Sequence, residues 1–165
     1  MHGEQREFLE AVARKHQAFH GMKVLELGSL NINGSARGVF NRACSWTGVD
    51  WREGPGVDEV SLAHEWDGDT DYDALVSGEM LEHDPHWVAS IRNGLMHLKP
   101  GAVVVITCAG PVRKPHRHDC APGGHYGNVE SGELHEVLSE LCESVLVEVG
   151  REGADVYAEA IRSHA

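Results

Sequence analysis

The segment Val24–Ser35 constrains the fold more than any other part of the chain. It opens with an apolar run, Val-Leu-Glu-Leu, that ends at Gly28, and Asn-Ile-Asn-Gly-Ser follows shortly after. A buried strand, a turn that glycine permits and a helix start form the arrangement by which parallel α/β sheets present backbone N–H groups to a nucleotide-like ligand. Asp50 ends the next apolar run. The sequence therefore predicts two acids, Glu26 and Asp50, at the ends of successive strands.

The size and charge of the chain limit what else it can be. Its 165 residues suffice for one α/β domain, so we expect residues 1–165 to form a single domain. The formal net charge of −12 makes a long nucleic acid an unfavourable partner. No apolar run approaches the roughly 20 residues that span a bilayer, and the N-terminus lacks the apolar core of a signal peptide. The four cysteines include no Cys-x-x-Cys pair, which favours reduced thiols and a cytoplasmic location.

Apolar periodicity predicts strands that alternate with helices. We expect helices over 4–19, 35–42, 84–97 and 131–141, and strands over 22–27, 45–49, 57–62, 73–77, 102–108, 144–149 and 154–161. The first helix fills the N-terminal segment 1–20, and the polar stretch 109–130 is predicted to be a long loop at the active site. The fold class that follows is α/β, a Rossmann-like, doubly wound and mostly parallel sheet that ends in an antiparallel hairpin.

Local signals refine these boundaries and expose one difficulty. Gly34 or Ser35 is predicted to cap the second helix, Asp84 the third and Ser131 the fourth. Only residues 51–56 separate the second and third strands. A crossover between parallel neighbours normally needs a dozen or more residues. Either a loop replaces the usual helix there, or one of the two strands is absent.

Several segments, taken in order, give the chain a resemblance to a known family. They are Val24–Gly28, Gly48–Asp50, Tyr72–His83, Leu98–Ala102 and the terminal hairpin. Together they resemble the class I S-adenosylmethionine-dependent methyltransferases, and similar compact proteins occur among small bacterial and bacteriophage methyltransferases. The resemblance runs from Lys23 to about Ile161, and its order is more specific than any single segment. Leu30 and Ile32 depart from it, because they stand where the family loop usually has glycines.

The resemblance implies a binding site for S-adenosylmethionine. Glu26 would lie near the amino group of this cofactor, and the turn from Gly28 to Gly34 near its methionine portion. Asp50 would accept hydrogen bonds from both ribose hydroxyls, and Trp51 would pack on the adenine, although a tryptophan there can equally be a packing residue. The implied cofactor residues are Glu26, Gly28, Ser29, Leu30, Asn33, Gly34, Asp50, Trp51, His64 and Gly78, with His64 at the adenine edge.

The segment Glu79-Met-Leu-Glu-His83 is the candidate for chemistry. If it turns helically after the fourth strand, Glu79, Glu82 and His83 share one face, because positions i, i+3 and i+4 are neighbours. Two carboxylates and an imidazole can then hold Mg²⁺ or Mn²⁺. The segment resembles the Glu-x-x-Glu-His motif of two methyltransferase groups, which methylate a catechol-type hydroxyl in quinone biosynthesis and the terminal 2′-hydroxyl of small RNAs. The second group implies a further histidine ligand, for which we prefer His118 to His116 and His125.

Two metal-free interpretations compete with this one. Leu-Glu-His is common after the fourth strand of methyltransferases that bind no metal, and there His83 acts as a general base or only donates a hydrogen bond. In the second metal-free interpretation the segment has only a structural role, with Glu82 as a cap or an ion-pair partner. A metal would lower the pKa of an acceptor hydroxyl, whereas a base would remove its proton directly.

The loop 109–130 adds three features whose roles the sequence leaves open. His116-x-His-x-Cys120 could hold Zn²⁺, but paired finger spacing is lacking and a metal-free loop is favoured. Arg113, Lys114 and Arg117 form a basic cluster that either meets an anionic acceptor or is simply solvated. Tyr126 would face the cleft if the loop closes as a lid.

The resemblance implies an enzyme that transfers a methyl group from S-adenosylmethionine, with His83, Glu79 and Glu82 as catalytic candidates. The expected acceptor is an oxygen of a small or nucleotide-like molecule, and a homodimer partner could complete its site. The alternative is a catalytically inactive module that binds the cofactor or a nucleotide and serves as a regulatory subunit. An ordinary dinucleotide-binding enzyme is disfavoured by the terminal hairpin and by the segment 79–83.

Overall fold

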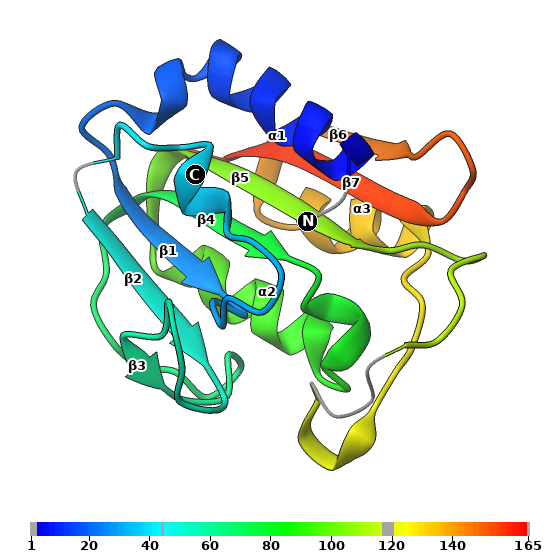
Figure 1. Ribbon diagram of the computed structural model, residues 1–165. Coiled ribbons are helices and arrows are strands. Elements are labelled where there is room, and N and C mark those ends of the chain that lie inside the picture. The colour runs from blue at the N-terminus through cyan, green and yellow to red at the C-terminus, as the bar shows by residue number, and fades with distance from the viewer. Residues whose placement is uncertain (1–2, 44, 117–120, 165) are drawn as a thin grey trace.

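A computed structural model describes residues 3–43, 45–116 and 121–164, which form a seven-stranded sheet (Figure 1). The strand order is β3-β2-β1-β4-β5-β7-β6. Five strands run parallel: β1 (Lys23–Leu27), β2 (Ser45–Asp50), β3 (Glu59–Val60), β4 (Tyr72–Gly78) and β5 (Leu98–Ala109). The hairpin of β6 (Cys142–Val149) and β7 (Asp155–Arg162) joins the sheet antiparallel to β5. The predicted parallel sheet with an antiparallel edge is confirmed.

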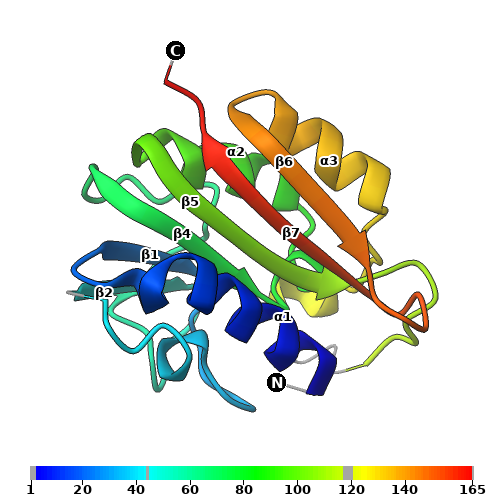
Figure 2. The ribbon, with the colours of Figure 1, turned by 90° about the horizontal axis from the view of Figure 1, so that it is seen from above.

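Helices cover both faces of the sheet. Helix α1 (Gly3–Lys15) lies on one face, and α2 (Trp87–Met96) and α3 (Ser131–Ser139) lie on the other (Figures 1 and 2). Side chains alternate between the two cores along each central strand, as the period of two in a strand requires. Val24, Ala74 and Val103 pack beneath α1, whereas their neighbours Leu25, Leu75 and Val104 pack toward α2 and α3.

The N-terminal helix is shorter than predicted. Instead of running from 4 to 19, it ends at Lys15, and a 3-10 turn, η1 (Gln17–Phe19), follows with positive φ at each of its residues. The turn reverses the chain, so that Phe19 becomes fully buried and its ring stacks on Phe40 at 4.0 Å between centroids. A continued helix could not place Phe19 there, so burial of this aromatic pair overrides the helical periodicity.

The expected helix over 35–42 is reduced to one turn, η2 (Ala36–Gly38). Ser35 caps it as predicted, and its hydroxyl accepts a hydrogen bond from the backbone N–H of Arg37. The third helix begins at Trp87, three residues after Asp84, whose carboxylate accepts the backbone N–H of His86. The capping box at the last helix is wrong, because its N-cap is Glu130 and no side chain caps it.

A loop replaces the helix between β2 and β3, which resolves the difficulty of the short connection. Val49 and Asp50 pair with Glu59 and Val60, so both strands exist. The loop folds back onto β2, and a Cβ atom added at Gly48 would lie 2.2 Å from the backbone oxygen of Gly56. Only glycine at position 48 permits this approach.

Among the described residues, the helices are too short or too polar for any of them to cross a membrane. Cys108 and Cys142 are free and buried, whereas Cys44 and Cys120 lie outside the described residues.

Candidate active site

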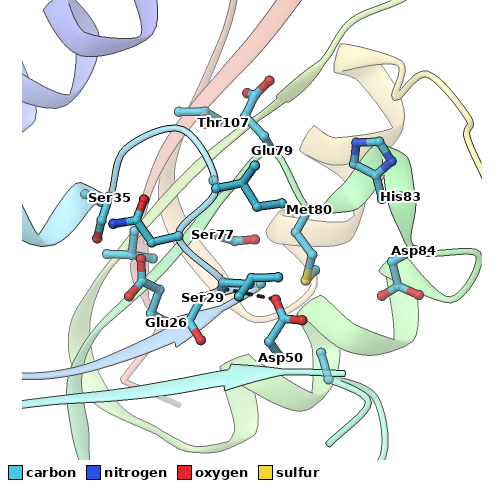
Figure 3. A pocket seen from close by; sticks show the side chains of 18 of the residues that line it. Glu26, Ser29, Ser35, Asp50, Ser77, Glu79, Met80, His83, Asp84 and Thr107 are labelled. Carbon is cyan, nitrogen blue, oxygen red and sulfur yellow. Dashed lines mark hydrogen bonds between the residues drawn. The ribbon is translucent and has the colours of Figure 1, made fainter. Parts of the chain in front are cut away.

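A cavity of about 400 Å³ opens at the carboxyl ends of the parallel strands (Figure 3). This is the edge at which open α/β sheets bind ligands. Its wall is built from α1, from the turns that follow β1, β2 and β4, and from the loop after β5. Figure 3 shows Glu26 and Ser35 on one side of the cavity and His83 and Asp84 on the other. A volume of this size suits a small organic ligand.

Nine of the ten cofactor residues implied by the resemblance line this cavity. They are Glu26, Gly28, Ser29, Leu30, Asn33, Gly34, Asp50, Trp51 and Gly78. The exception is His64, whose ring lies against His86 at 4.4 Å between centroids and is absent from the lining. The preceding residues 61–63 line the cavity in its place.

Two constraints require glycine at position 28, in the turn after β1. Its φ is +72°, and a Cβ atom there would lie 2.5 Å from the Cβ of Met80. The backbone N–H groups of Gly28 and Ser29 both donate to the carbonyl of Val49, which ties the turn to β2. Leu30, in the place of a family glycine, packs toward Gly54, where an added Cβ would lie 2.2 Å from its side chain.

Asp50 holds the turn after β1 from the end of β2. Its carboxylate accepts the backbone N–H of Leu30 at 3.1 Å and that of Arg52 at 3.3 Å (Figure 3). Burial raises the pKa of Asp50, and these hydrogen bonds partly offset the rise. The side chain therefore links the first turn to the second strand while remaining at the cavity wall.

Glu26 lies on β1 and forms an ion pair with Arg37, a residue outside the cavity lining. Its carboxylate accepts from Arg37 Nε at 2.8 Å, and Arg37 also reaches the carbonyl of Gly56 and the carboxylate of Asp58. Burial raises the pKa of Glu26, whereas the hydrogen bond to Arg37 lowers it. Arg37 does not line the cavity, so Glu26 keeps its place in the wall while its charge is balanced from outside.

The segment 79–83 does not form the helical face that we expected. Glu79 has a φ of +55°, and a 3-10 turn, η3 (Leu81–His83), follows it. Glu79 lies outside the group of ligand atoms that Glu82, His83 and His116 form. Its carboxylate lies 3.9 Å from Arg113 and 3.5 Å from Gln5 Nε2. The helical face predicted for this segment is therefore wrong, and a role of Glu79 at a metal stays a prediction.

Glu82 and His83 meet a histidine from the long loop. Glu82, His83 and His116 each offer a ligand atom, and these atoms lie within 4.8 Å of one another. Glu82 is fully buried, and neither of its carboxylate oxygens has a hydrogen-bond partner in the described part of the chain. The other histidine of the metal prediction, His118, lies outside the described residues, as do Arg117 and Cys120.

The described parts of the long loop, 109–116 and 121–130, contact this cluster. The backbone N–H of Gly127 donates to the carbonyl of Glu82 at 2.8 Å. The ring of Tyr126 lies 5.4 Å from that of His83 and 5.3 Å from that of His116. Arg113 pairs with Asp155 and Glu79, so the charge of the predicted basic cluster is already balanced at this residue.

Burial of Glu82 has a consequence for stability. Burial first, and the negative charge of Glu79 second, raise the pKa of Glu82 to about 8 from its usual 4.5. The folded state then holds a proton that the unfolded chain releases between these values. We therefore expect the free energy of unfolding of metal-free protein to fall as the pH rises from about 4.5 to about 8.

The Glu82→Gln variant is expected to lack this part of the pH dependence. Urea unfolding in the presence of a chelator, between about pH 5 and 8.5, measures the slope for each protein. Glu133→Gln, at an exposed position of α3, is the matched control and should keep the wild-type slope. Equal slopes for wild type and Glu82→Gln would contradict a neutral carboxyl at this position.

Gln5, Thr107 and Arg37 are among the residues of the site that sequence reasoning missed. Gln5 lines the cavity and donates to Thr107 Oγ1 at 2.7 Å, and Arg37 pairs with Glu26. One signal for Gln5 was available, because it precedes Leu9 and Val12 by four and seven positions and so lies on the apolar stripe of its helix. The pairing of Arg37 depends on a loop path that no local pattern specifies.

Comparisons with known proteins find similarity in structure but not in sequence. No family model and no curated protein matches the chain. Among solved structures, the Burkholderia thailandensis 1,6-didemethyltoxoflavin-N1-methyltransferase, with S-adenosylhomocysteine bound, is 16% identical with a TM-score of 0.69, and the match covers 98% of this chain and 79% of that one.

Two further structures show the range of similar proteins. The DhpI–S-adenosylhomocysteine complex is 19% identical with a TM-score of 0.66, over the full length of both chains. The CurJ carbon methyltransferase is 14% identical with a TM-score of 0.65, over 96% of this chain and 55% of that one. The strand order and the terminal hairpin point to the same fold as these structural matches. The chain has the fold of the class I S-adenosylmethionine-dependent methyltransferases.

Proposed function

We propose that this protein is a methyltransferase that uses S-adenosylmethionine. The observation that carries the proposal is the cavity at the carboxyl ends of β1, β2 and β4, whose wall brings together nine of the ten implied cofactor residues. The buried hydroxyls of Ser29 and Ser77 at this wall have no hydrogen-bond partner among the described residues. Polar atoms buried without a partner are costly, so their presence beside a cavity supports a polar ligand.

Each wall residue then has a specific task toward the cofactor. Asp50 accepts hydrogen bonds from the ribose hydroxyls, and Trp51, which is 37% exposed, offers its ring to the adenine. The turn from Gly28 to Gly34 contacts the methionine portion. When bound, S-adenosylmethionine supplies an electrophilic methyl group. His83, at the opposite side of the cavity, accepts the proton of the acceptor group as general base (Figure 3).

The same residues support a proposal for the acceptor class. A hydroxyl must lose a proton on methylation, and His83 lies at the cavity wall to take it. We therefore propose an oxygen of a small or nucleotide-like molecule as the acceptor. The similar structures include an N1-methyltransferase and a carbon methyltransferase. A test of acceptors should therefore compare nitrogen and carbon acceptors with oxygen acceptors. A cytoplasmic location and a homodimer complete the proposal.

Equilibrium binding tests the function before any acceptor is known. Isothermal titration of the purified protein with S-adenosylhomocysteine should give a dissociation constant in the micromolar range, and adenosine diphosphate should bind far more weakly. No detectable binding at millimolar S-adenosylhomocysteine would reject the proposal. Binding without any methylated product across hydroxyl, amine and carbon acceptors would favour the alternative, a catalytically inactive module.

A divalent metal at Glu82, His83 and His116 is the finer form of this proposal. Their donor set fits a metal, because a buried carboxylate without a partner lies beside two imidazoles. Such a mixed set of nitrogen and oxygen ligands favours Mn²⁺ over Mg²⁺. The metal would lower the pKa of an acceptor hydroxyl bound to it.

Titration with Mn²⁺ alone tests the metal site. We expect one Mn²⁺ per chain for the wild type, and no binding for Glu82→Gln or His116→Ala, because each removes a ligand. Glu133→Gln, at an exposed position of α3, is the matched control, because it removes a carboxylate that lies outside the cluster and should leave Mn²⁺ binding unchanged. If the wild type does not bind Mn²⁺ at millimolar concentration, His83 acts as the base without a metal.

A further inference from the structure

We infer that Gln5, on the N-terminal helix, is a positioning residue that binds the α-ammonium group of the cofactor's amino acid portion. The inference rests on the proposed S-adenosylmethionine site. It extends that site to α1, for which the sequence analysis predicts no binding role.

The amide of Gln5 lies over the adjoining carboxyl ends of β4 and β5. The residue is 4% exposed, lines the cavity and donates from Nε2 to Thr107 Oγ1 at 2.7 Å. A Cβ atom added at Gly78, the last residue of β4, would lie 3.8 Å from Gln5 Nε2. The side chain of Gln5 thus extends from α1 to the carboxyl end of β4.

The contacts of the amide nitrogen fix which way the amide faces. Besides the bond to Thr107, Nε2 lies 3.5 Å from Glu79 Oε1, and a carboxylate oxygen can face only the donor end of the amide. The other end, Oε1, is buried and has no hydrogen-bond partner in the described part of the chain. An unpaired buried acceptor is unfavourable, so a donor from a bound ligand would stabilise this arrangement.

The charge of the wall indicates the kind of donor. Glu26 and Glu79 are carboxylates of the same cavity, and Gln5 adds a carbonyl oxygen. Arg37 balances Glu26 from outside the cavity and does not occupy it. Arg113 also lines the cavity, but it is paired with Asp155 and lies 3.9 Å from Glu79. The acceptor oxygens of Glu26 and Gln5 fit a cationic group with several N–H donors, and an ammonium carries three. The amino acid portion of S-adenosylmethionine ends in such a group.

Two ligands that differ only in this portion test the inference. S-Adenosylhomocysteine carries the amino acid portion, and 5′-methylthioadenosine lacks it while keeping adenosine and sulfur. By isothermal titration, we expect Gln5→Leu to raise the dissociation constant of S-adenosylhomocysteine by about tenfold, which equals about 1.4 kcal/mol. The dissociation constant of 5′-methylthioadenosine should stay unchanged. Gln5→Glu keeps an acceptor oxygen and should bind S-adenosylhomocysteine more tightly than Gln5→Leu.

The controls separate this inference from the fold and from the proposed function. Arg6→Leu, at an exposed position of the same helix, should change neither affinity. If Gln5→Leu fails to fold, Gln5→Met makes the same comparison with a flexible side chain of similar length. Unchanged binding of S-adenosylhomocysteine by a folded Gln5 variant, or an equal loss for both ligands, would overturn the inference. A wild type that binds neither ligand would instead contradict the proposed function.

Discussion

His83→Asn is expected to lower the rate of methyl transfer by roughly 10²–10⁴-fold, the usual effect of losing a general base. His83 is 8% exposed, lines the cavity and follows the carboxyl end of β4. Its ring is enclosed by His116 and Tyr126, which restrict its orientation. The same loss follows if His83 is a metal ligand, so the variant tests the residue and the Mn²⁺ titration tests its role.

The measurement uses the first acceptor that the wild type methylates, with the rate taken at saturating S-adenosylmethionine. His86→Asn is the matched control, because His86 is three residues away but is absent from the cavity lining. It should retain the wild-type rate. S-Adenosylhomocysteine binding by His83→Asn should remain close to the wild-type value, which shows that the site is folded. A His83 variant that transfers methyl groups within about threefold of the wild-type rate would rule out both chemical roles.

Asp50→Ala is expected to weaken S-adenosylhomocysteine binding by about 1–3 kcal/mol, a factor of roughly 5 to 150 in the dissociation constant. Two effects act in the same direction. The variant removes the carboxylate proposed to accept the ribose hydroxyls, and it removes the acceptor that holds the backbone N–H of Leu30. Asp50→Asn separates them, because its amide oxygen can still accept from Leu30 but carries no charge.

Asp73→Ala is the control for the structural part of this effect. Asp73 also accepts a backbone N–H, that of Lys23 at 2.8 Å, but it lies at the opposite end of the sheet and outside the cavity lining. Its loss should leave cofactor affinity unchanged, as measured by isothermal titration. An Asp50→Ala protein that binds S-adenosylhomocysteine as the wild type does would remove the ribose assignment.

Much of the fold was predictable because its signals are local. The apolar runs at 22–27, 73–77 and 102–108 fall within or next to strands of the structure, and their order fixes the parallel sheet. The ends of the helical segments were harder to predict. The segments 17–19 and 79 adopt positive φ values that no residue there requires, since none is glycine. Tertiary contacts hold those conformations, so periodicity alone gave helices that are too long.

The candidate site divides in the same way. Residues implied by a motif, such as Gly28 and Asp50, line the cavity because a motif specifies a strand and the turn attached to it. His64 misses the lining because the short β3, Glu59–Val60, leaves the path of the next turn to packing. His116 joins Glu82 through tertiary structure, since the described parts of the loop after β5, including Gly127, contact η3.

The sequence by itself determined which strands form, that most of them run parallel, and that Glu26 and Asp50 lie near the ends of β1 and β2. Each of these features depends on apolar runs and turns that are only a few residues long. The tertiary structure alone decided which polar groups share the cavity. Gln5 meets Thr107 across 102 positions of sequence, and Arg37 balances Glu26 from a loop. Such contacts depend on how helices and loops pack over the strand ends. Local sequence preferences do not specify contacts between residues so far apart in the chain.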